Sequence, residues 1–90
     1  MRYYLAPTIG TGTEADPYRP KVADYQCNWA AVYSTPDETE AIVAVSATED
    51  VFDLIGADAD MIFLGDDLDE AMTTEEFQRI APDGQVMVSG

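Results

Sequence analysis

The chain has 90 residues with 18 acidic and four basic side chains, a formal net charge of −14, one Cys and no His. A chain of this length forms one domain that buries only about 60–65% of its unfolded surface, so its core is modest. The hydrophobic content of 47% nevertheless excludes a disordered acidic tail. The single Cys excludes an internal disulfide, and a structural zinc site lacks its usual His and Cys ligands.

The acidic side chains are concentrated in one long stretch. From Val22 to Gln78 there are fifteen acids and no Lys or Arg. This charge disfavours direct binding to nucleic acid or to an anionic membrane, because binding to phosphates depends on cations. An acid-rich, Lys-poor surface is typical of a protein from a halophilic organism; the alternative is an ordinary acidic protein kept soluble by its charge.

The start of the chain lacks the features of a signal peptide. Residues 1–7 carry one charge and a very short apolar run, whereas a signal peptide has an apolar region of about 7–15 residues. No run in the sequence approaches the roughly 20 apolar residues that span a bilayer. We therefore expect a protein that is made and used without export.

The first predicted strand covers Arg2–Ile9. Tyr3 and Leu5 face one side and Tyr4 the other, and Pro7 is expected to end the strand because it has no backbone donor for a ladder. Residues 10–21 follow as an extended loop or arm, since residues 10–20 contain two Gly and two Pro.

Two strands and a hairpin are predicted next. Asn28–Tyr33 has apolar side chains on both faces, which indicates an inner strand. Ala41–Val45 is a continuous apolar run of strand length. The polar connector between these segments predicts that they pair as an antiparallel hairpin.

A βαβ unit is predicted from the middle of the chain. Ser46 and Glu49 have the spacing of a capping box ahead of an amphipathic helix, and Gly56 suits the left-handed position that ends it. Met61–Leu64 is then a short buried strand. Strand, helix and strand in this order predict a right-handed crossover between two parallel strands.

The last third predicts a turn, a helix and a strand. Residues 65–70 form an acidic turn, and Thr73–Glu76 repeats the capping-box spacing before a helix that Pro82 ends. Phe77, Ile80 and Ala81 form its apolar side. Asp83–Gly84 is a turn signal before a final strand over Gln85–Val88.

Together these elements predict the α/β (α+β) class. Residues 1–90 form a single small domain, with a mixed sheet of four or five strands, a βαβ unit and two short helices packed on the sheet.

Two motifs that suggest chemistry each lack a residue that the chemistry requires. Gly10–Thr13 resembles a phosphate loop, but the required Lys is missing, and Glu14 and Asp16 repel phosphate. Cys27 has no His to act as its base, so we interpret it as a packed small residue beside Trp29.

Paired carboxylates are too abundant to be diagnostic of glycosidase-type acid and base catalysis. Asp58–Asp60 and Asp66–Glu70 offer oxygen ligands for Ca²⁺ or Mg²⁺, but an EF-hand loop from Asp58 needs Gly where Phe63 stands. An irregular cation site is the alternative to a solvated acidic surface. We expect no enzyme activity, no catalytic residue, no cofactor and no metal.

The stretch from Asp58 to Glu76 contains eight acids among nineteen residues. Such a surface can imitate a phosphate backbone, as small anti-restriction and nuclease-inhibitor proteins do. The second functional hypothesis is therefore an acidic DNA mimic that inhibits a host DNA-binding protein or nuclease.

The arm is the favoured site for contact with a partner protein. Its prolines fix two backbone torsions, and it presents a Tyr and an Arg, which are enriched where interfaces concentrate their energy. Its two cations would also be attracted to an acidic patch on a neighbouring copy. The alternative is that Tyr18 packs on the chain's own sheet and Arg19 pairs with a local acid. The predicted partner-binding residues are Asp16, Pro17, Tyr18, Arg19, Pro20 and Lys21.

The first thirty residues resemble a group of small proteins encoded by tailed double-stranded DNA phages. The resemblance rests on Tyr3-Tyr4-Leu5-Ala6-Pro7, Gly10-Thr11-Gly12-Thr13 and Asp16-Pro17-Tyr18-Arg19-Pro20, followed by Asn28-Trp29. It implies a non-enzymatic virion accessory protein, such as a capsid decoration protein or a head or tail component. Such a protein is made in the host cytoplasm and binds capsid or tail subunits or its own copies. The resemblance assigns no functional residue.

Overall fold

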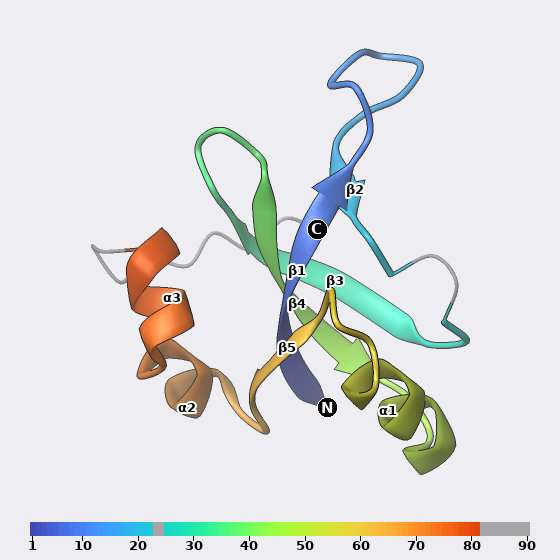
Figure 1. Cartoon of the computed structure of the whole chain (residues 1–90), viewed down its shortest axis with the longest axis vertical. Coiled ribbons are helices and arrows are strands. Elements are labelled where there is room, and N and C mark those ends of the chain that lie inside the picture. The colour runs from blue at the N-terminus through green and yellow to red at the C-terminus, as the bar shows by residue number, and fades with distance from the viewer. Residues whose placement is uncertain (23–24, 82–90) are drawn as a thin grey trace.

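The computed structural model describes residues 1–22 and 25–81. This part of the chain forms five strands and three helices (Figure 1). They are β1 (Arg2–Ile9), β2 (Arg19–Pro20), β3 (Asn28–Ser34), β4 (Glu40–Ser46), α1 (Glu49–Gly56), β5 (Ile62–Gly65), α2 (Leu68–Met72) and α3 (Glu75–Ile80).

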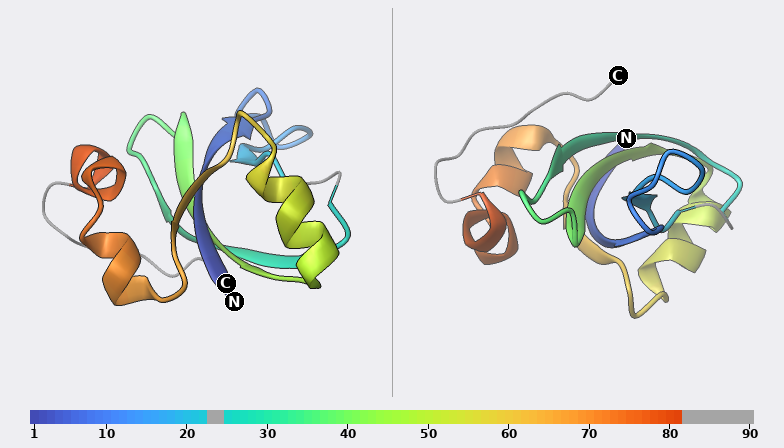
Figure 2. Two further views of the ribbon diagram at one scale, coloured as in Figure 1. Left: turned by 60° about the horizontal axis from the view of Figure 1, so that its bottom comes forward. Right: turned by 90° about the horizontal axis from the view of Figure 1, so that it is seen from above.

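The sheet is organised around β1. On one edge, residues 2–7 of β1 pair with β4, and β3 pairs with the far edge of β4. β5 pairs with Tyr3–Leu5 of β1, and β2 pairs with Thr8 and Ile9. The strands curve together into a half-barrel (Figure 2). The predicted α+β class and the sheet of four or five strands are confirmed, although β2 was not among the predicted strands.

The two strands of the predicted βαβ unit are parallel, as expected, but they do not pair with each other. β4 and β5 run in the same direction because both are antiparallel to β1, but β1 lies between them. β4 has no free edge for β5, since β1 and β3 occupy its two edges. Every pairing among the described strands is therefore antiparallel, and the sheet is not mixed.

Helices cover both faces of the sheet. The face with Tyr4, Val43 and Val45 packs against Phe52 and Ile55 of α1. The opposite face packs against α2 and α3 through a second cluster, which consists of Leu5, Ile42, Leu64, Ala71, Phe77, Ile80 and Ala81. Figure 2 shows the sheet between α1 on one side and the α2–α3 pair on the other. The predicted alternation of β1 and the predicted apolar side of α3 are confirmed.

The first helix begins and ends differently from the prediction. Thr48 is the N-cap of α1, and its side chain makes no cap bond. Ser46 lies in β4 opposite Asn28, so it does not cap the helix. Gly56 lies inside the helix, and Ala57 is the C-cap with right-handed backbone angles. The capping box and the glycine stop are therefore both wrong.

The acidic turn contains an additional helix, so three helices replace the predicted two. Asp67 caps α2 by accepting a hydrogen bond from the Glu70 N–H at 2.7 Å. α3 begins one residue later than expected, because Thr74 and not Thr73 caps it by accepting from the Phe77 N–H at 3.2 Å.

Two strand predictions also need correction. β1 continues through Pro7, which lies opposite Glu40 and whose carbonyl accepts a hydrogen bond from the Lys21 N–H at 3.0 Å. β3 pairs with β4 alone among the described strands, and 38% of Trp29 is exposed. β3 is therefore an edge strand of the described sheet and not an inner one.

The remaining predictions fall at the end of the chain. Pro82, the Asp83–Gly84 turn and the strand over Gln85–Val88 lie outside the described residues. No helix in the described ranges is both long and apolar enough to cross a membrane.

Candidate functional site

The predicted arm folds back as a β-hairpin. Thr8 lies opposite Pro20 and Ile9 opposite Arg19, so residues 10–18 form the tip between β1 and β2. This hairpin tip projects from the body of the molecule at the top of Figure 1. The short ladder positions the predicted partner-binding residues at the end of the central strand.

The backbone of the tip is held by one carbonyl group. The Asp16 carbonyl oxygen accepts hydrogen bonds from the N–H groups of Thr11, Gly12 and Thr13 at 3.1, 3.0 and 3.3 Å. The Asp16 N–H donates in return to the Thr13 carbonyl oxygen at 3.1 Å. These bonds satisfy the polar backbone and give the tip a defined shape.

Both glycines of the tip are required by its geometry. Gly10 has φ of 113° and Gly12 has φ of 77°, which side-chain-bearing residues rarely adopt. A Cβ on Gly10 would lie 2.3 Å from the Pro17 carbonyl oxygen. A Cβ on Gly12 would lie 2.4 Å from Cε2 of Tyr18. The glycines therefore permit the bend and allow the Tyr18 ring to lie against the backbone.

Arg19, the first residue of β2, is bound to two residues of the tip. Its Nη1 donates to Asp16 Oδ1 at 2.8 Å and to the Pro17 carbonyl oxygen at 3.0 Å. The hydrogen bond from Arg19 lowers the pKa of Asp16, so this carboxylate stays ionised. The alternative interpretation of Arg19, a pair with a local acid, is the arrangement that the structure contains.

Tyr18 is the exposed aromatic residue of the tip. Tyr18 is 45% exposed, so its ring is not buried against the sheet. Pro17 beside it is also exposed, whereas Pro20 is buried in β2. The structure thus brings all six predicted residues into one hairpin but exposes them unequally.

A small cavity adjoins Tyr18 between the two hairpins of the sheet. Its volume is about 220 Å³. It is lined by Thr8, Tyr18, Arg19, Pro20, Ala31, Ser34, Glu38 and Ala41. Tyr18 forms part of its wall.

Each of the four cations has an acidic neighbour within the chain. Lys21 Nζ lies 2.7 Å from Asp60 Oδ2, which ties the hairpin to the start of β5. Arg2 lies 3.6 Å from both Glu49 and Asp66 and stacks 4.3 Å from the centre of the Phe52 ring. The uncompensated charge of the molecule is therefore entirely negative, which disfavours binding of polyanions.

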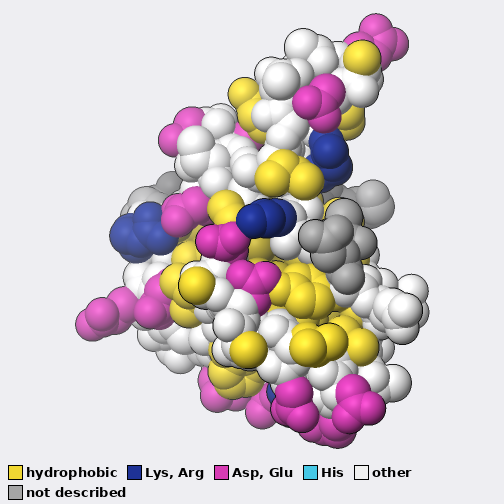
Figure 3. Space-filling view, turned by 45° about the vertical axis from the view of Figure 1, so that its right-hand side comes forward, with side chains coloured by type: hydrophobic (Ala, Val, Ile, Leu, Met, Phe, Trp, Pro, Cys, Tyr) yellow, Lys and Arg dark blue, Asp and Glu magenta, His cyan; other side chains and the backbone are white. Residues whose placement is uncertain are grey.

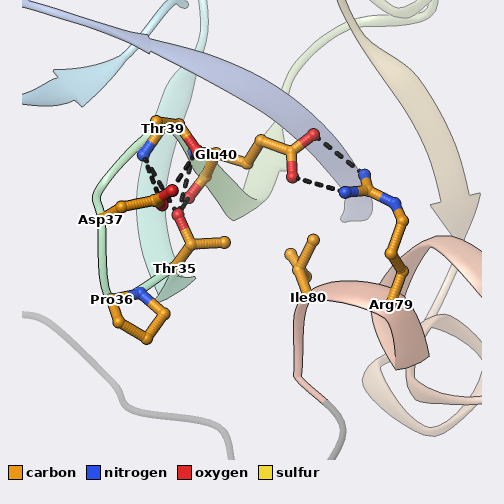
Figure 4. A pocket seen from close by; sticks show the side chains of 7 residues that line it. All are labelled: Thr35, Pro36, Asp37, Thr39, Glu40, Arg79 and Ile80. Carbon is orange, nitrogen blue, oxygen red and sulfur yellow. Dashed lines mark hydrogen bonds and ion pairs between the residues drawn. The ribbon is translucent and has the colours of Figure 1, made fainter.

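A second and larger pocket lies between the β3–β4 turn and α3 (Figure 4). Its volume is about 440 Å³, and it is lined by Thr35, Pro36, Asp37, Thr39, Glu40, Arg79 and Ile80. Sequence reasoning did not find it, because residues distant in the sequence form it.

The polar groups of this pocket bind one another. The Thr35 hydroxyl accepts from the N–H groups of Thr39 and Glu40 at 3.1 and 3.2 Å, and Arg79 holds the Glu40 carboxylate. Hydrogen bonds from Thr35 and Thr39 lower the pKa of Asp37, which makes it a poor general acid. The arrangement stabilises the turn and contains no activated nucleophile.

Cys27 lies half-buried against the cluster beneath α1. Burial raises the pKa of its thiol above the ordinary value, the opposite of the shift that activates a cysteine nucleophile. This position agrees with the interpretation of Cys27 as a packed residue. Within residues 1–22 and 25–81, no three Cys, Asp or Glu side chains are grouped so that they could hold a metal ion.

Exposed apolar side chains occur away from the hairpin tip. Figure 3 shows hydrophobic side chains gathered across one face, with acidic side chains along its lower rim. Ile62 and Phe63 of β5 are 44% and 49% exposed, although the sequence predicted a buried strand there. Only Leu64 and Gly65 of β5 are buried.

Comparison with known proteins finds no match: the chain matches no family model, no curated protein and no solved structure. No role can therefore be transferred from a relative, and the likeness of residues 1–30 to phage proteins stays a prediction.

Proposed function

We propose that the protein is a non-enzymatic accessory subunit that binds another protein through its hairpin tip. The assembly suggested by the sequence resemblance is the virion of a tailed phage. The observation that carries the proposal is the position of Tyr18: its ring rests on Gly12, stays 45% exposed and borders a cavity of about 220 Å³.

The rigidity of the tip supports binding of a partner. A loop that is already ordered loses less conformational entropy on binding than a flexible one. The bonds to the Asp16 carbonyl and the clamp of Arg19 on Asp16 order the segment before any contact. Tyr18 is thus presented as a fixed aromatic anchor, a residue type that is enriched at the centres of interfaces.

The pairing of Arg19 changes the role that we assign to it. Its guanidinium is engaged by Asp16 and Pro17, so Arg19 acts by holding the tip. The tip therefore presents an aromatic and proline surface with a locally balanced ion pair. It suits an apolar groove on the partner.

Substitutions at the tip test this role in assembled particles. Tyr18→Ala removes the anchor and leaves the backbone bonds intact, so the variant should fold but fail to join purified particles. Particle content would be measured by quantitative mass spectrometry, and folding by circular dichroism. Leu54→Ala, at an apolar residue of α1 that is 63% exposed, is the matched control and should be incorporated normally.

Arg19→Ala has its own control in Arg79→Ala. Both arginines are ion-paired and partly exposed, but Arg79 lies on α3, away from the tip. Only the Arg19 variant should reduce incorporation. Absence of the wild-type protein from particles would refute the virion role, and inhibition of a nuclease at low salt would favour the DNA-mimic alternative. Equal incorporation of the Tyr18 and Leu54 variants would refute the docking role of the tip.

A further inference from the structure

The outer edge of β5 is a second surface, separate from the hairpin tip. β5 pairs with β1 through one edge, at Tyr3–Leu5. Among the described strands, none pairs with its other edge. Backbone N–H and C=O groups on a free edge are a template for another extended strand.

The side chains of this edge are open on both faces of the sheet. Phe63 lies opposite Tyr4, whose ring centre is 5.6 Å away, and Ile62 lies opposite Leu5. Tyr4 and Leu5 belong to the two different core clusters, so Phe63 and Ile62 point to opposite faces. Phe63 is 49% exposed and Ile62 is 44% exposed, so an added strand would contact apolar surface on both faces.

Carboxylates flank this apolar pair at both ends of the strand. Asp58 and Asp60 precede β5, and Asp66 and Asp67 follow it directly. A hydrogen bond from Tyr25 lowers the pKa of Asp58, and the Asp66 side chain is 72% exposed. Lys21 and Arg2 neutralise part of this charge. The four carboxylates outnumber these two cations, so the net charge around the strand stays negative.

We infer that the β5 edge binds an extended segment of a basic partner protein, in which apolar residues are flanked by Lys or Arg. The segment adds to the sheet as a strand, its apolar side chains cover Ile62 and Phe63, and its cations lie near the acids at the two ends. A second copy of this chain is disfavoured as the occupant, because its own acids would be placed against these carboxylates.

The experiment uses the full chain and a fluorescein-labelled peptide with a run of valines flanked by lysines at both ends. Fluorescence anisotropy should show binding that weakens as salt rises, because part of the attraction is between exposed charges. A peptide with glutamates in place of the lysines should not bind.

A third peptide separates strand addition from simple charge attraction. It carries the same lysines but has an N-methyl group on every valine, which removes the backbone donors from both of its edges. We expect its Kd to be at least about tenfold higher, because the backbone hydrogen bonds to β5 are lost. In hydrogen exchange, the unmethylated peptide should slow the outward-facing amides of Ile62–Gly65.

Variants of the protein locate the site. Ile62→Ala should weaken peptide binding several-fold, whereas Leu54→Ala, at another exposed apolar residue, should leave it unchanged. Asp66→Asn should reduce affinity and its dependence on salt more than Asp50→Asn, which removes the same charge from α1. Ile62 is used because Phe63 also contacts the Tyr4 ring, and its loss could affect folding.

Three results would overturn the inference. One is the absence of binding at low salt, and another is equal binding of the methylated and unmethylated peptides. The third is a concentration-dependent dimer that protects the β5 amides without peptide, which would identify a second copy as the occupant. Failure here would leave the hairpin tip untouched, since the two surfaces share no residue.

Discussion

Arg79 makes a bidentate ion pair with Glu40 through its guanidinium group. Nη1 and Nη2 each lie 2.9 Å from one carboxylate oxygen, which connects α3 to the first residue of β4 across 39 positions of sequence. The contact raises the pKa of Arg79 through hydrogen bonding and charge attraction. It also forms one wall of the larger pocket (Figure 4).

The geometry of this pair predicts a small but specific effect of Arg79→Lys. Lysine keeps the charge but cannot make the two parallel hydrogen bonds. We expect a slight decrease in Tm, because the Arg79 side chain is 57% exposed and solvent screens the pair. A double-mutant cycle with Glu40→Gln, measured by urea denaturation, should reveal the coupling. Strictly additive effects would show that the pair contributes nothing.

Phe77→Ala should be far more damaging than any change at the surface. Phe77 is fully buried beneath the sheet face that α2 and α3 cover, and its ring centre lies 6.1 Å from that of Tyr33. Removal of a buried Phe costs about 3–5 kcal/mol of unfolding free energy, a large part of the roughly 5–15 kcal/mol of a small domain. Urea denaturation would measure this, and Leu54→Ala, exposed on α1, should change stability by less than about 0.5 kcal/mol.

Two Gly→Ala substitutions should act in opposite directions. Gly10→Ala places a methyl group against the Pro17 carbonyl in a left-handed position, so it should disrupt the tip and destabilise the hairpin. Gly56→Ala meets no atom within 4 Å and lies in α1, where Ala is favoured by about 0.5–1 kcal/mol. Thermal unfolding should show Tm falling for the first and rising for the second. Equal shifts would contradict the described conformation of the tip.

The bond between Tyr25 and Asp58 predicts a dependence of stability on pH. The Tyr25 hydroxyl donates to the Asp58 carboxylate and lowers the pKa of Asp58 below its ordinary value of 3.8. This carboxylate therefore stabilises the fold at pH values above its unfolded pKa, and the contribution is lost as the pH falls through the folded pKa.

The comparison with Asp58→Asn isolates this contribution. The unfolding free energy of the wild type relative to Asp58→Asn should be greatest near neutral pH and should shrink as the pH falls below about 4. Asp50→Asn is the control for the loss of one charge from this very acidic chain. The same pH profile for both variants would argue against a special role of the Tyr25 bond.

Local patterns were sufficient to locate most strands. The alternation of Arg2–Ile9 and the apolar run of Ala41–Val45 identify β1 and β4, because burial on one or both faces of a sheet imposes these patterns directly. The antiparallel hairpin of β3 and β4 follows from the polar connector between them.

Neighbours in space could not be read from the same patterns. Met61–Leu64 is equally apolar whether its strand lies inside a sheet or at an edge, so the exposure of Ile62 and Phe63 was not predictable. The pairing of β5 with β1 depends on residues near the start of the chain. The α2 helix was missed because its Asp67 cap lies in an acidic run that also suits a turn.

The sequence predicted the residues of the candidate site better than it predicted their backbone conformation. The clustering of Gly and Pro predicted an extended loop over residues 10–21, which is correct for residues 10–18 but wrong for Arg19–Pro20, where β2 pairs with β1. The pair of Arg19 with a local acid was one of two alternatives. The three amides that converge on the Asp16 carbonyl could not be foreseen, because nothing in the side-chain pattern specifies a backbone acceptor.

The central place of β1 sets the order in which the protein can acquire its structure during synthesis. β1 leaves the ribosome before its partners β4 and β5, which come much later in the sequence, and Tyr3 pairs with Gly65. Contacts between such distant residues require the closure of long loops before they contribute free energy, which slows folding. Residues 2–7 of β1 therefore lack their strand partners until β4 and β5 have been made.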